Sequence, residues 1–135
     1  MFSTKGIYGL RAMYELYKAN KSVPLKTYQI SERTHISKNY LEQLLGALRR
    51  AGLIKSIRGA NGGYLLAKEP KDIKVLEILE ILEGDIKLYD KKDGDPVLDL
   101  FFSSVIENVK KSLDISLEDF KKYEDRYAQY LHYSI

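Results

Sequence analysis

Residues 36–64 read ISKNYLEQLLGALRRAGLIKSIRGANGGY, a helical pattern that runs directly into a glycine-rich hairpin pattern. The helical part extends from Ser37 to Ala51, and the Ser37 hydroxyl can cap its first turn by accepting a backbone hydrogen bond. Gly52 ends the helix. Apolar residues at spacings of three and four predict one buried stripe, which consists of Leu41, Leu44, Leu45 and Leu48.

The hairpin follows this helix without a linker. Its strands are predicted at 53–57 and 64–67, and the tip between them is Arg58-Gly59-Ala60-Asn61-Gly62-Gly63. Asn61-Gly62 predicts a type I′ turn, because both residue types tolerate positive φ. A helix followed by such a hairpin is typical of a winged helix-turn-helix. The predicted fold class is therefore mostly α, with a small β-hairpin wing and a long dimerisation helix farther along the chain.

Two upstream segments supply the other helices of this motif. One helix is predicted over 5–20, and a shorter one over 27–33 is anchored by Ile30. Thr34-His35-Ile36 is the expected turn before the capped helix. His35 is interpreted as a turn residue, because no second histidine, serine nucleophile or carboxylate pair lies near it in sequence. The apolar face expected of the first helix contains Ile7, Leu10, Ala12, Met13, Leu16 and Tyr17.

Downstream of the wing, residues 73–83 predict a helix that is apolar nearly all round and therefore well buried. A polar connection over 85–96 follows this helix. Its aspartates do not match a calcium-binding EF-hand loop, because the spacing differs and the closing glutamate is missing. A solvated loop is the interpretation.

Residues 97–113 predict a second strongly periodic helix, the long helix of the chain. Its apolar seam is wider than a thin single-domain layer needs, which favours a helix partner from a second subunit. Packing on its own chain alone stays open as the alternative. The candidate dimer-interface residues are Leu98, Phe101, Phe102, Val105 and Val109.

The C-terminal end is predicted to be a short helix that is capped by Ser116 and contains Phe120 and Tyr123. The last residues, with Tyr127, Tyr130, Tyr133 and Ile135, are too aromatic for a frayed tail, so we expect them to dock on the body or on a partner. The chain then divides into a winged helix-turn-helix region, 1–70, and a helical dimerisation and regulatory region, 71–135, within one compact domain.

The charge distribution separates these two regions. The formal net charge of +3 combines +8 in the first region with −5 in the second. A basic first half favours a polyanionic partner, although charge alone also fits a membrane surface or an acidic protein. The chain has no cysteine, which excludes disulfides and thiolate metal sites. No apolar run approaches the ~18 to 20 residues of a membrane span, so we expect a cytoplasmic protein without a membrane contact.

Arg58 stands at the root of the glycine-rich tip, where little side-chain bulk surrounds it. Its guanidinium can therefore lie beside a narrow minor groove. The alternative is an exposed cation on an ordinary surface hairpin, and this residue alone favours that alternative.

Several linked motifs together resemble the Rrf-two family of bacterial winged-helix transcription regulators, along essentially the whole chain. In chain order, they are Ser3-Thr4-Lys5-Gly6 with Tyr8-Gly9-Leu10-Arg11-Ala12, Ile36-Ser37 with Tyr40-Leu41-Glu42-Gln43, Leu48-Arg49 with Ala51-Gly52-Leu53, Arg58-Gly59 with Gly62-Gly63-Tyr64, and Leu82-Glu83-Gly84.

The resemblance implies a homodimer whose long helices cross and whose two winged helices bind a palindromic operator in double-stranded DNA. It also implies that helix 37–50 enters the major groove and that Arg58 enters the minor groove. Glu42 can accept from a cytosine amino group, and Asn39 and Gln43 carry donors and acceptors for base edges. Tyr40 fits a backbone contact and a packing role equally. The DNA-binding residues implied are Ser37, Lys38, Asn39, Tyr40, Glu42, Gln43, Arg49, Arg58 and Gly59.

The resemblance also bears on cofactors and partners. Many members of the family hold an iron-sulfur cluster through three cysteines between the buried helix and the long helix. This sequence has no cysteine, and that region has no histidine, so no cofactor is expected. Cluster-free members include a repressor of cysteine metabolism that is controlled by complex formation with O-acetylserine thiol-lyase. Residues 116–120, Tyr123 and residues 130–135 resemble that branch, which makes this enzyme a candidate partner.

A DNA-binding repressor is thus the favoured function, and a winged helix that serves as a protein-interaction module is the alternative. An enzyme has no support, because the sequence shows no nucleophile-base pair and no metal constellation. The segment from Gly59 to Gly63 also lacks the lysine and Ser/Thr of a phosphate-binding loop.

Overall fold

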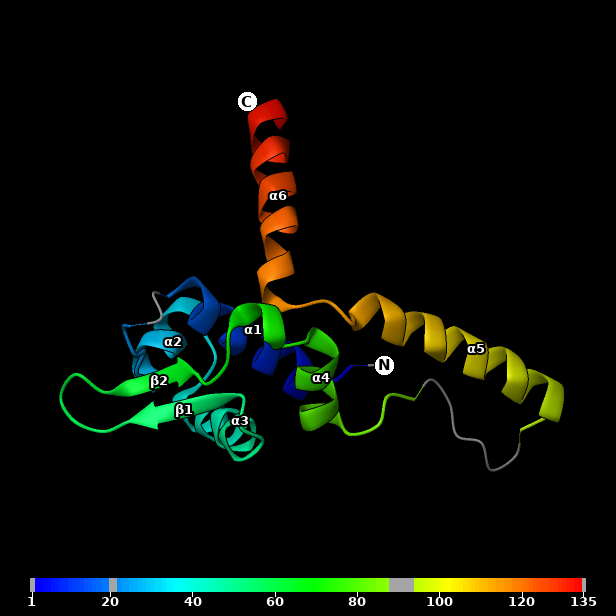
Figure 1. The fold of residues 1–135 in the computed structure, drawn as a ribbon, viewed down its shortest axis with the longest axis horizontal. Helices are drawn as coiled ribbons and strands as arrows, with labels where there is room; N and C mark the ends of the chain where they lie inside the picture. Colours follow the sequence, from blue (N-terminus) through cyan, green and yellow to red (C-terminus); the bar gives the residue numbers. More distant parts are fainter. Residues whose placement is uncertain (1, 20–21, 88–93, 135) are drawn as a thin grey trace.

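The computed structural model describes residues 2–19, 22–87 and 94–134, and Figure 1 shows their arrangement. The elements in chain order are α1 (Thr4–Lys18), α2 (Thr27–Thr34), α3 (Lys38–Arg50), β1 (Ile54–Ile57), β2 (Gly63–Leu66), the 3-10 helix η1 (Pro70–Asp72), α4 (Val75–Glu83), α5 (Pro96–Leu113), the 3-10 helix η3 (Leu117–Asp119) and α6 (Phe120–Ser134).

One hydrophobic core holds α1 to α4 and the hairpin together. Its largest fully buried side chains include Met13 of α1, Ile30 of α2 and Leu45 of α3. Ile78 of α4 and Leu117 of η3 belong to the same cluster, so the core draws residues from both sides of the predicted boundary at residue 70. Each such side chain contributes about 1.5 to 3 kcal/mol when it is removed from water.

Helices α1 and α4 approach each other most closely at two glycines of α1. A methyl group at Gly9 would overlap the side chain of Leu82. At the start of α1, one oxygen of Glu83, Oε1, accepts hydrogen bonds from the Ser3 N–H at 2.8 Å, the Ser3 hydroxyl at 2.7 Å and the Gly6 N–H at 2.8 Å. These bonds, above all the one from the Ser3 hydroxyl, lower the pKa of Glu83.

The helix and hairpin predicted from residues 36–64 are confirmed. Ser37 is the N-cap of α3, and the backbone carries positive φ at Gly52, directly after the helix. The strands lie within one residue of their predicted bounds. The predicted type I′ turn at Asn61-Gly62 is wrong, since positive φ occurs at Gly59 and Gly63 instead. Pairing ends at Ile57 and Gly63, and the tip closes through a bond from the Gly62 N–H to the Gly59 carbonyl.

Two predicted burials need correction. Ile7 was expected on the inner face of α1, but it is 45% exposed and lies beside α6. Gly6 and Gly9 occupy the inner face instead, because α4 lies too close there for a side chain. Helix α4 is not buried all round: Val75 and Ile78 are buried, whereas Leu76 and Ile81 are only partly covered.

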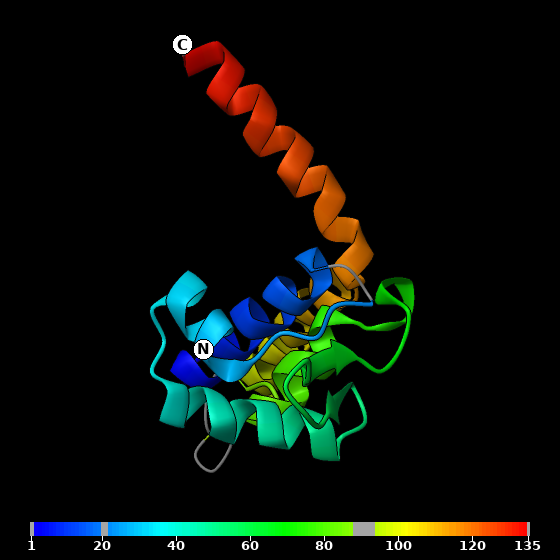
Figure 2. The same ribbon diagram turned by 90° about the vertical axis from the view of Figure 1, so that its left-hand side faces the viewer.

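Helices α5 and α6 leave the body in different directions (Figures 1 and 2). The prediction of a short last helix is wrong, because α6 has 15 residues. Docking of its aromatic end on the body is also wrong: Tyr127, Tyr130 and Tyr133 are exposed, the last at 86%. One side of α6 carries Phe120, Tyr123, Tyr127, Tyr130 and Leu131 at helical spacing, and the last four are exposed because the helix extends away from the body (Figure 1).

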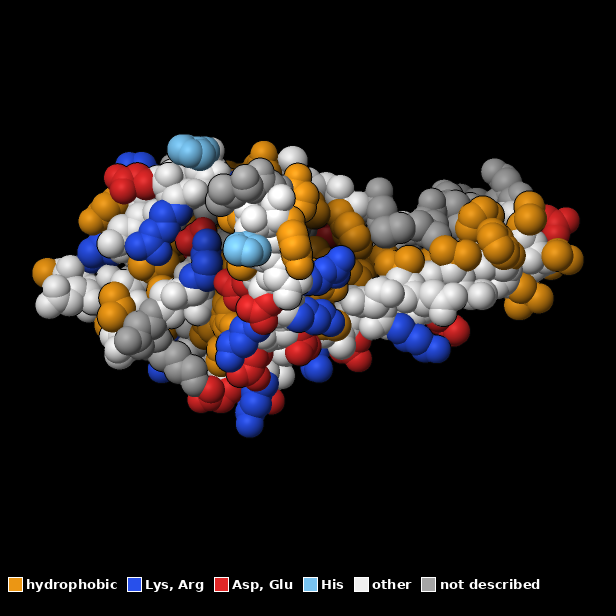
Figure 3. Space-filling model, turned by 90° about the horizontal axis from the view of Figure 1, so that it is seen from above, with side chains coloured by type: hydrophobic (Ala, Val, Ile, Leu, Met, Phe, Trp, Pro, Cys, Tyr) orange, Lys and Arg blue, Asp and Glu red, His pale blue; other side chains and the backbone are white. Residues whose placement is uncertain are grey.

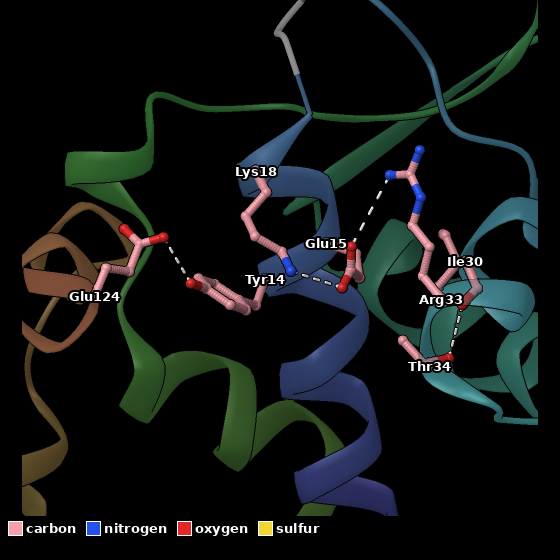
Figure 4. A network of polar contacts seen from close by, with 7 residues as sticks. All are labelled: Tyr14, Glu15, Lys18, Ile30, Arg33, Thr34 and Glu124. Atoms are coloured by element: carbon pink, nitrogen blue, oxygen red, sulfur yellow. Dashed lines mark hydrogen bonds and ion pairs between the residues drawn. The ribbon is translucent and has the colours of Figure 1, made fainter. Parts of the chain in front are cut away.

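The root of α6 is fixed to α1 by an aromatic contact and a hydrogen bond. Phe120 meets the Tyr14 ring edge-on with centroids 5.4 Å apart, and the Tyr14 hydroxyl donates to Glu124 at 2.7 Å (Figure 4). Burial first, and the Glu124 carboxylate second, raise the pKa of Tyr14 to about 12.

Two predicted features lie at least partly outside the described residues. They are the solvated connection over 85–96, of which 88–93 are not described, and Ile135. Among the described helices, none is both long enough and apolar enough to cross a bilayer.

Candidate nucleic-acid interface

Burial of one face of α3 determines which side chains the opposite face presents. The four leucines of the predicted stripe are buried. Lys38, Asn39, Glu42 and Gln43 are therefore exposed in the first half of the helix, with Arg49 in the last turn. The Ser37 hydroxyl accepts from the Tyr40 N–H at 3.3 Å and fixes where the helix begins. This face carries both hydrogen-bonding groups and positive charge.

The turn between α2 and α3 is built without glycine. His35 adopts the left-handed conformation with φ 60°, which histidine tolerates better than most residues. The Thr34 hydroxyl donates to the Ile30 carbonyl at 2.7 Å (Figure 4) and lies 3.3 Å from the Ile36 N–H. The Ser31 hydroxyl donates to the Ile36 carbonyl at 2.6 Å. These bonds hold the turn in place, and His35 is the turn residue that was predicted.

Tyr40 connects α3 to the start of α1. Its ring is partly buried and meets Tyr8 edge-on, with centroids 6.0 Å apart. Its hydroxyl lies 3.3 Å from the Thr4 hydroxyl. Packing therefore holds the ring, while the hydroxyl lies at the surface beside the exposed residues Thr4 and Lys5.

The wing extends from the body at the end of β1, as Figure 1 shows. Arg58 and Gly59 are both exposed at its tip, and Gly59 has φ 109°. On the other strand, Tyr64 pairs with Leu25 through two backbone bonds of 3.0 and 2.7 Å. The Lys26 ammonium lies 3.3 Å from the Gly59 carbonyl and donates to it. The wing is thus fastened to the segment that leads into α2.

Glu42 is bonded to both neighbours of α3. The Thr27 hydroxyl donates to its Oε1 at 2.5 Å, and the Tyr64 hydroxyl donates to its Oε2 at 3.3 Å. Burial is the main cause that raises the pKa of Tyr64, and the Glu42 carboxylate adds to it. A carboxylate has about four acceptor positions, so the one group can take further donors.

Sequence reasoning missed three residues of this surface, namely Lys26, Thr27 and Tyr64. Tyr64 was noted only within a motif, and the two others only within a predicted helix or before it. A usable signal existed for Thr27, because the first residue of the helix before a recognition helix commonly lies near the same surface. The bonds to Glu42 had no sequence signal, since their donors lie 15 and 22 residues away.

The candidate dimer-interface residues share an uncovered helix. None of the residues of α5 is buried within the chain. Leu98 and Phe101 are 54% and 58% exposed, and Phe102, Val105 and Val109 are partly covered. Hydrophobic side chains gather at the end of α5 farthest from the body (Figure 3). The helix contacts the body at α4, and Lys110 pairs at 3.5 Å with Asp85, which lies just after the end of α4.

Comparison with known proteins gives a consistent result. The family model Rrf2, described as an iron-dependent transcriptional regulator, matches residues 2–121. The HTH-type transcriptional regulator CymR of Bacillus subtilis is 42% identical over 125 residues, which cover 91% of this chain and 91% of that protein. The solved structure of CymR, titled the global cysteine regulator of B. subtilis, has a TM-score of 0.82 and 41% identity, with 91% of this chain and 97% of that chain covered.

A second solved structure, T. potens IscR, has a TM-score of 0.80 and 42% identity over 92% of this chain and 88% of that one. These relatives are regulators of transcription and not enzymes, which confirms both the predicted fold class and the predicted non-catalytic role.

The residues present do not fit the iron chemistry that the family's description implies. The chain has no cysteine to bind iron as thiolate. In the part of the chain that the structure describes, no three His, Cys, Asp or Glu side chains lie together as a metal site. What the chain shares with its relatives is the winged helix-turn-helix and the sequence that builds it. On the evidence of its fold, its motifs and the match over residues 2–121, the protein belongs to the Rrf2 family of helix-turn-helix transcriptional regulators.

Proposed function

We propose that this protein is a homodimeric repressor that occupies a palindromic operator and works without an iron-sulfur cluster. The observation that carries the proposal is the exposed face of α3, which lies beside the wing and is bonded to it. Such a surface matches a major groove with an adjacent minor groove. A protein of this kind acts where the chromosome is, in the bacterial cytoplasm.

The residue roles follow from exposure and chemistry. Asn39 and Gln43 present amides that can bond base edges in the major groove. Ser37, Lys38 and Arg49 suit phosphate contacts, which position the protein without reading sequence. Arg58 inserts into the minor groove, where a narrow A·T-rich segment concentrates negative potential. Gly59 lets the backbone of the wing approach the sugar-phosphate chain closely.

The dimer contact is assigned to α5. An 18-residue helix with no buried residue and several exposed apolar side chains is unstable as a free surface. Pairing with a second α5 removes Leu98, Phe101 and their neighbours from water. A two-fold axis between the helices then presents two copies of α3, which requires a palindromic operator.

Control of cysteine metabolism is the regulatory role that the relatives favour. CymR carries the printed description of a global cysteine regulator, and it matches nearly the whole of this chain. The exposed helix α6 provides a surface on which O-acetylserine thiol-lyase can bind the repressor. Titration of the purified enzyme should change operator affinity, and O-acetylserine should reverse that change. An affinity that stays constant in both titrations would remove the enzyme from the proposal.

Selection of genomic duplexes by the purified protein tests the central proposal. We expect an enriched palindrome, and the observed binding constant should fall with salt with a logarithmic slope of roughly −0.9 per neutralised phosphate. A palindrome upstream of sulfur-assimilation genes supports the cysteine role as well. A palindrome elsewhere keeps the repressor and rejects that role. No enriched sequence at all would instead indicate a protein-interaction module.

A further inference from the structure

We propose that Glu42 is a positioning residue, which braces the recognition helix against the wing and α2 through hydrogen bonds to Tyr64 and Thr27. The inference rests on the proposed DNA-binding function and specifies how its surface is held together. Both carboxylate oxygens of Glu42 are engaged, each by a hydroxyl from a different element.

The two donors are themselves fixed in place. Thr27 is the first residue of α2, whose buried Ile30 anchors the helix in the core. Tyr64 is held by two backbone bonds to Leu25 and by a partly buried ring. Its hydroxyl is protonated at neutral pH, as in any tyrosine, and is therefore able to donate; burial first, and the Glu42 carboxylate second, raise the pKa of Tyr64 further. Glu42 thus meets rigid donors, so the bonds restrain α3 instead of following it.

A second observation shows that the wing must lie close to this segment. Gly63 has φ 145°, and a Cβ there would come within 2.5 Å of the Leu25 carbonyl oxygen. The Lys26 ammonium adds its bond to the Gly59 carbonyl. Leu25 and Lys26 therefore hold the wing to the segment before α2, and Glu42 holds it to α3.

The brace has a consequence for DNA reading. The groups that enter the two grooves, on α3 and at Arg58, become parts of one rigid unit with a fixed separation. Any bond from a cytosine amino group to Glu42 then has to use the acceptor positions that the two hydroxyls leave open, in the orientation that the brace fixes. Preorganised contacts of this kind strengthen binding because less ordering remains to be done in the complex.

A comparison of variants on the selected operator tests the inference. Glu42→Ala removes the acceptor, Tyr64→Phe removes one donor while keeping the ring, and Thr27→Val removes the other donor at nearly constant volume. Tyr64→Phe and Thr27→Val should each weaken operator binding by about tenfold or more, the effect of one lost hydrogen bond to a charged group, and Glu42→Ala, which removes both bonds, should weaken it by at least as much. The loss should spread over positions contacted by α3 and by the wing, as measured with single-base-pair variants of the operator.

Tyr14→Phe is the matched control. It also removes a tyrosine hydroxyl that donates to a glutamate, but at the root of α6. It should leave the operator profile unchanged. Thermal unfolding of every variant identifies any that fail to fold, and Tyr64→Phe with Thr27→Val keeps the test valid if Glu42→Ala is lost in this way.

A double-mutant cycle between Glu42→Ala and Tyr64→Phe gives the decisive measurement. Positioning predicts that the double variant loses clearly less than the product of the two single losses. A loss confined to one base pair per half-site in Glu42→Ala, with Tyr64→Phe unchanged, would show base reading and overturn the inference. Unchanged binding in all three variants would overturn it too. If the wild type selects no duplex, it is the proposed function that fails.

Discussion

The surface around the wing differs from the surface of the C-terminal helices in whether its exposed side chains contact other parts of the chain. Around the wing, side chains from α2, α3 and β2 are bonded to each other although they lie at the surface. Helices α5 and α6 expose large apolar and aromatic side chains that the chain itself leaves uncovered. The first region is complete in one chain, and the second has the character of a surface made for another molecule.

The largest effect should come from a charge on α5. Val105→Glu should prevent formation of the proposed dimer, because a carboxylate cannot be buried in an apolar helix pair without a partner. Operator affinity should then fall by about 100-fold or more, since two linked half-site contacts become independent. Sedimentation and operator titration provide the measurements, with Glu107→Gln, on the face of α5 opposite Val105, as the control. A Val105→Glu protein that still sediments as a dimer would place the interface elsewhere.

Removal of the wing cation should affect only the first region. Arg58→Ala should weaken binding by about 1 to 3 kcal/mol on operators with a narrow A·T-rich minor groove, with little change in the dimer. Lys55→Ala, on the adjacent strand, is the control for a general loss of charge. Equal losses on G·C-rich and A·T-rich duplexes would argue against insertion of Arg58 into the minor groove.

The close contact of α1 and α4 distinguishes two glycines that sequence alone treats alike. Gly9→Ala should lower the free energy of unfolding by about 1 to 3 kcal/mol, because the methyl group overlaps Leu82. Gly46→Ala in α3 meets only the flexible end of Arg50, so it should raise stability by about 0.5 to 1 kcal/mol through helix propensity. Chemical denaturation measures both, and similar values for the two would contradict the packing described.

The smallest effect concerns the bond at the root of α6. Because the pKa of Tyr14 is raised to about 12, the folded protein retains this proton where the unfolded chain loses it. The stabilising contribution is therefore complete below pH 10, the ordinary pKa of tyrosine, and is lost as pH rises toward 12. Stability measured across this range should decline less steeply in Tyr14→Phe. Parallel curves for the two proteins would show that the hydroxyl bond is not formed in solution.

The difference between the regions also explains what the sequence could predict. Helix α3 and the wing strands depend on local signals, namely the Ser37 cap, the leucine spacing and the glycines, and these were read within one or two residues. The predicted turn type was wrong because Gly63 packs against the backbone of Leu25, which is remote in sequence. The predicted burial of Ile7 was wrong for a similar reason, since the position of α4 determines which face of α1 is buried.

For the candidate site, exposure of the predicted α3 residues followed from the leucine stripe, because a helix that buries one face must expose the other. The partners of Glu42 did not follow from any pattern. They depend on how α2 and β2 approach α3, and that geometry emerges only from the assembled core. The length of α6 was underestimated because the prediction placed only Phe120 and Tyr123 on this helix and assigned Tyr127 and Tyr130, which continue the same helical spacing, to a separate chain end.

One oxygen of Glu83, at the end of α4, accepts all three hydrogen bonds from the start of α1. These three bonds therefore form or break together. A translation of one helix along the other would break these three bonds, and the close packing of Gly9 against Leu82 leaves no space for a smaller movement. The two helices therefore move as one unit, and α3 is connected to this unit by the contact between the Tyr40 and Thr4 hydroxyls. If two copies pair through α5, as we propose, a movement of these two helices together would change the distance between the two winged helices and leave the structure of each unchanged.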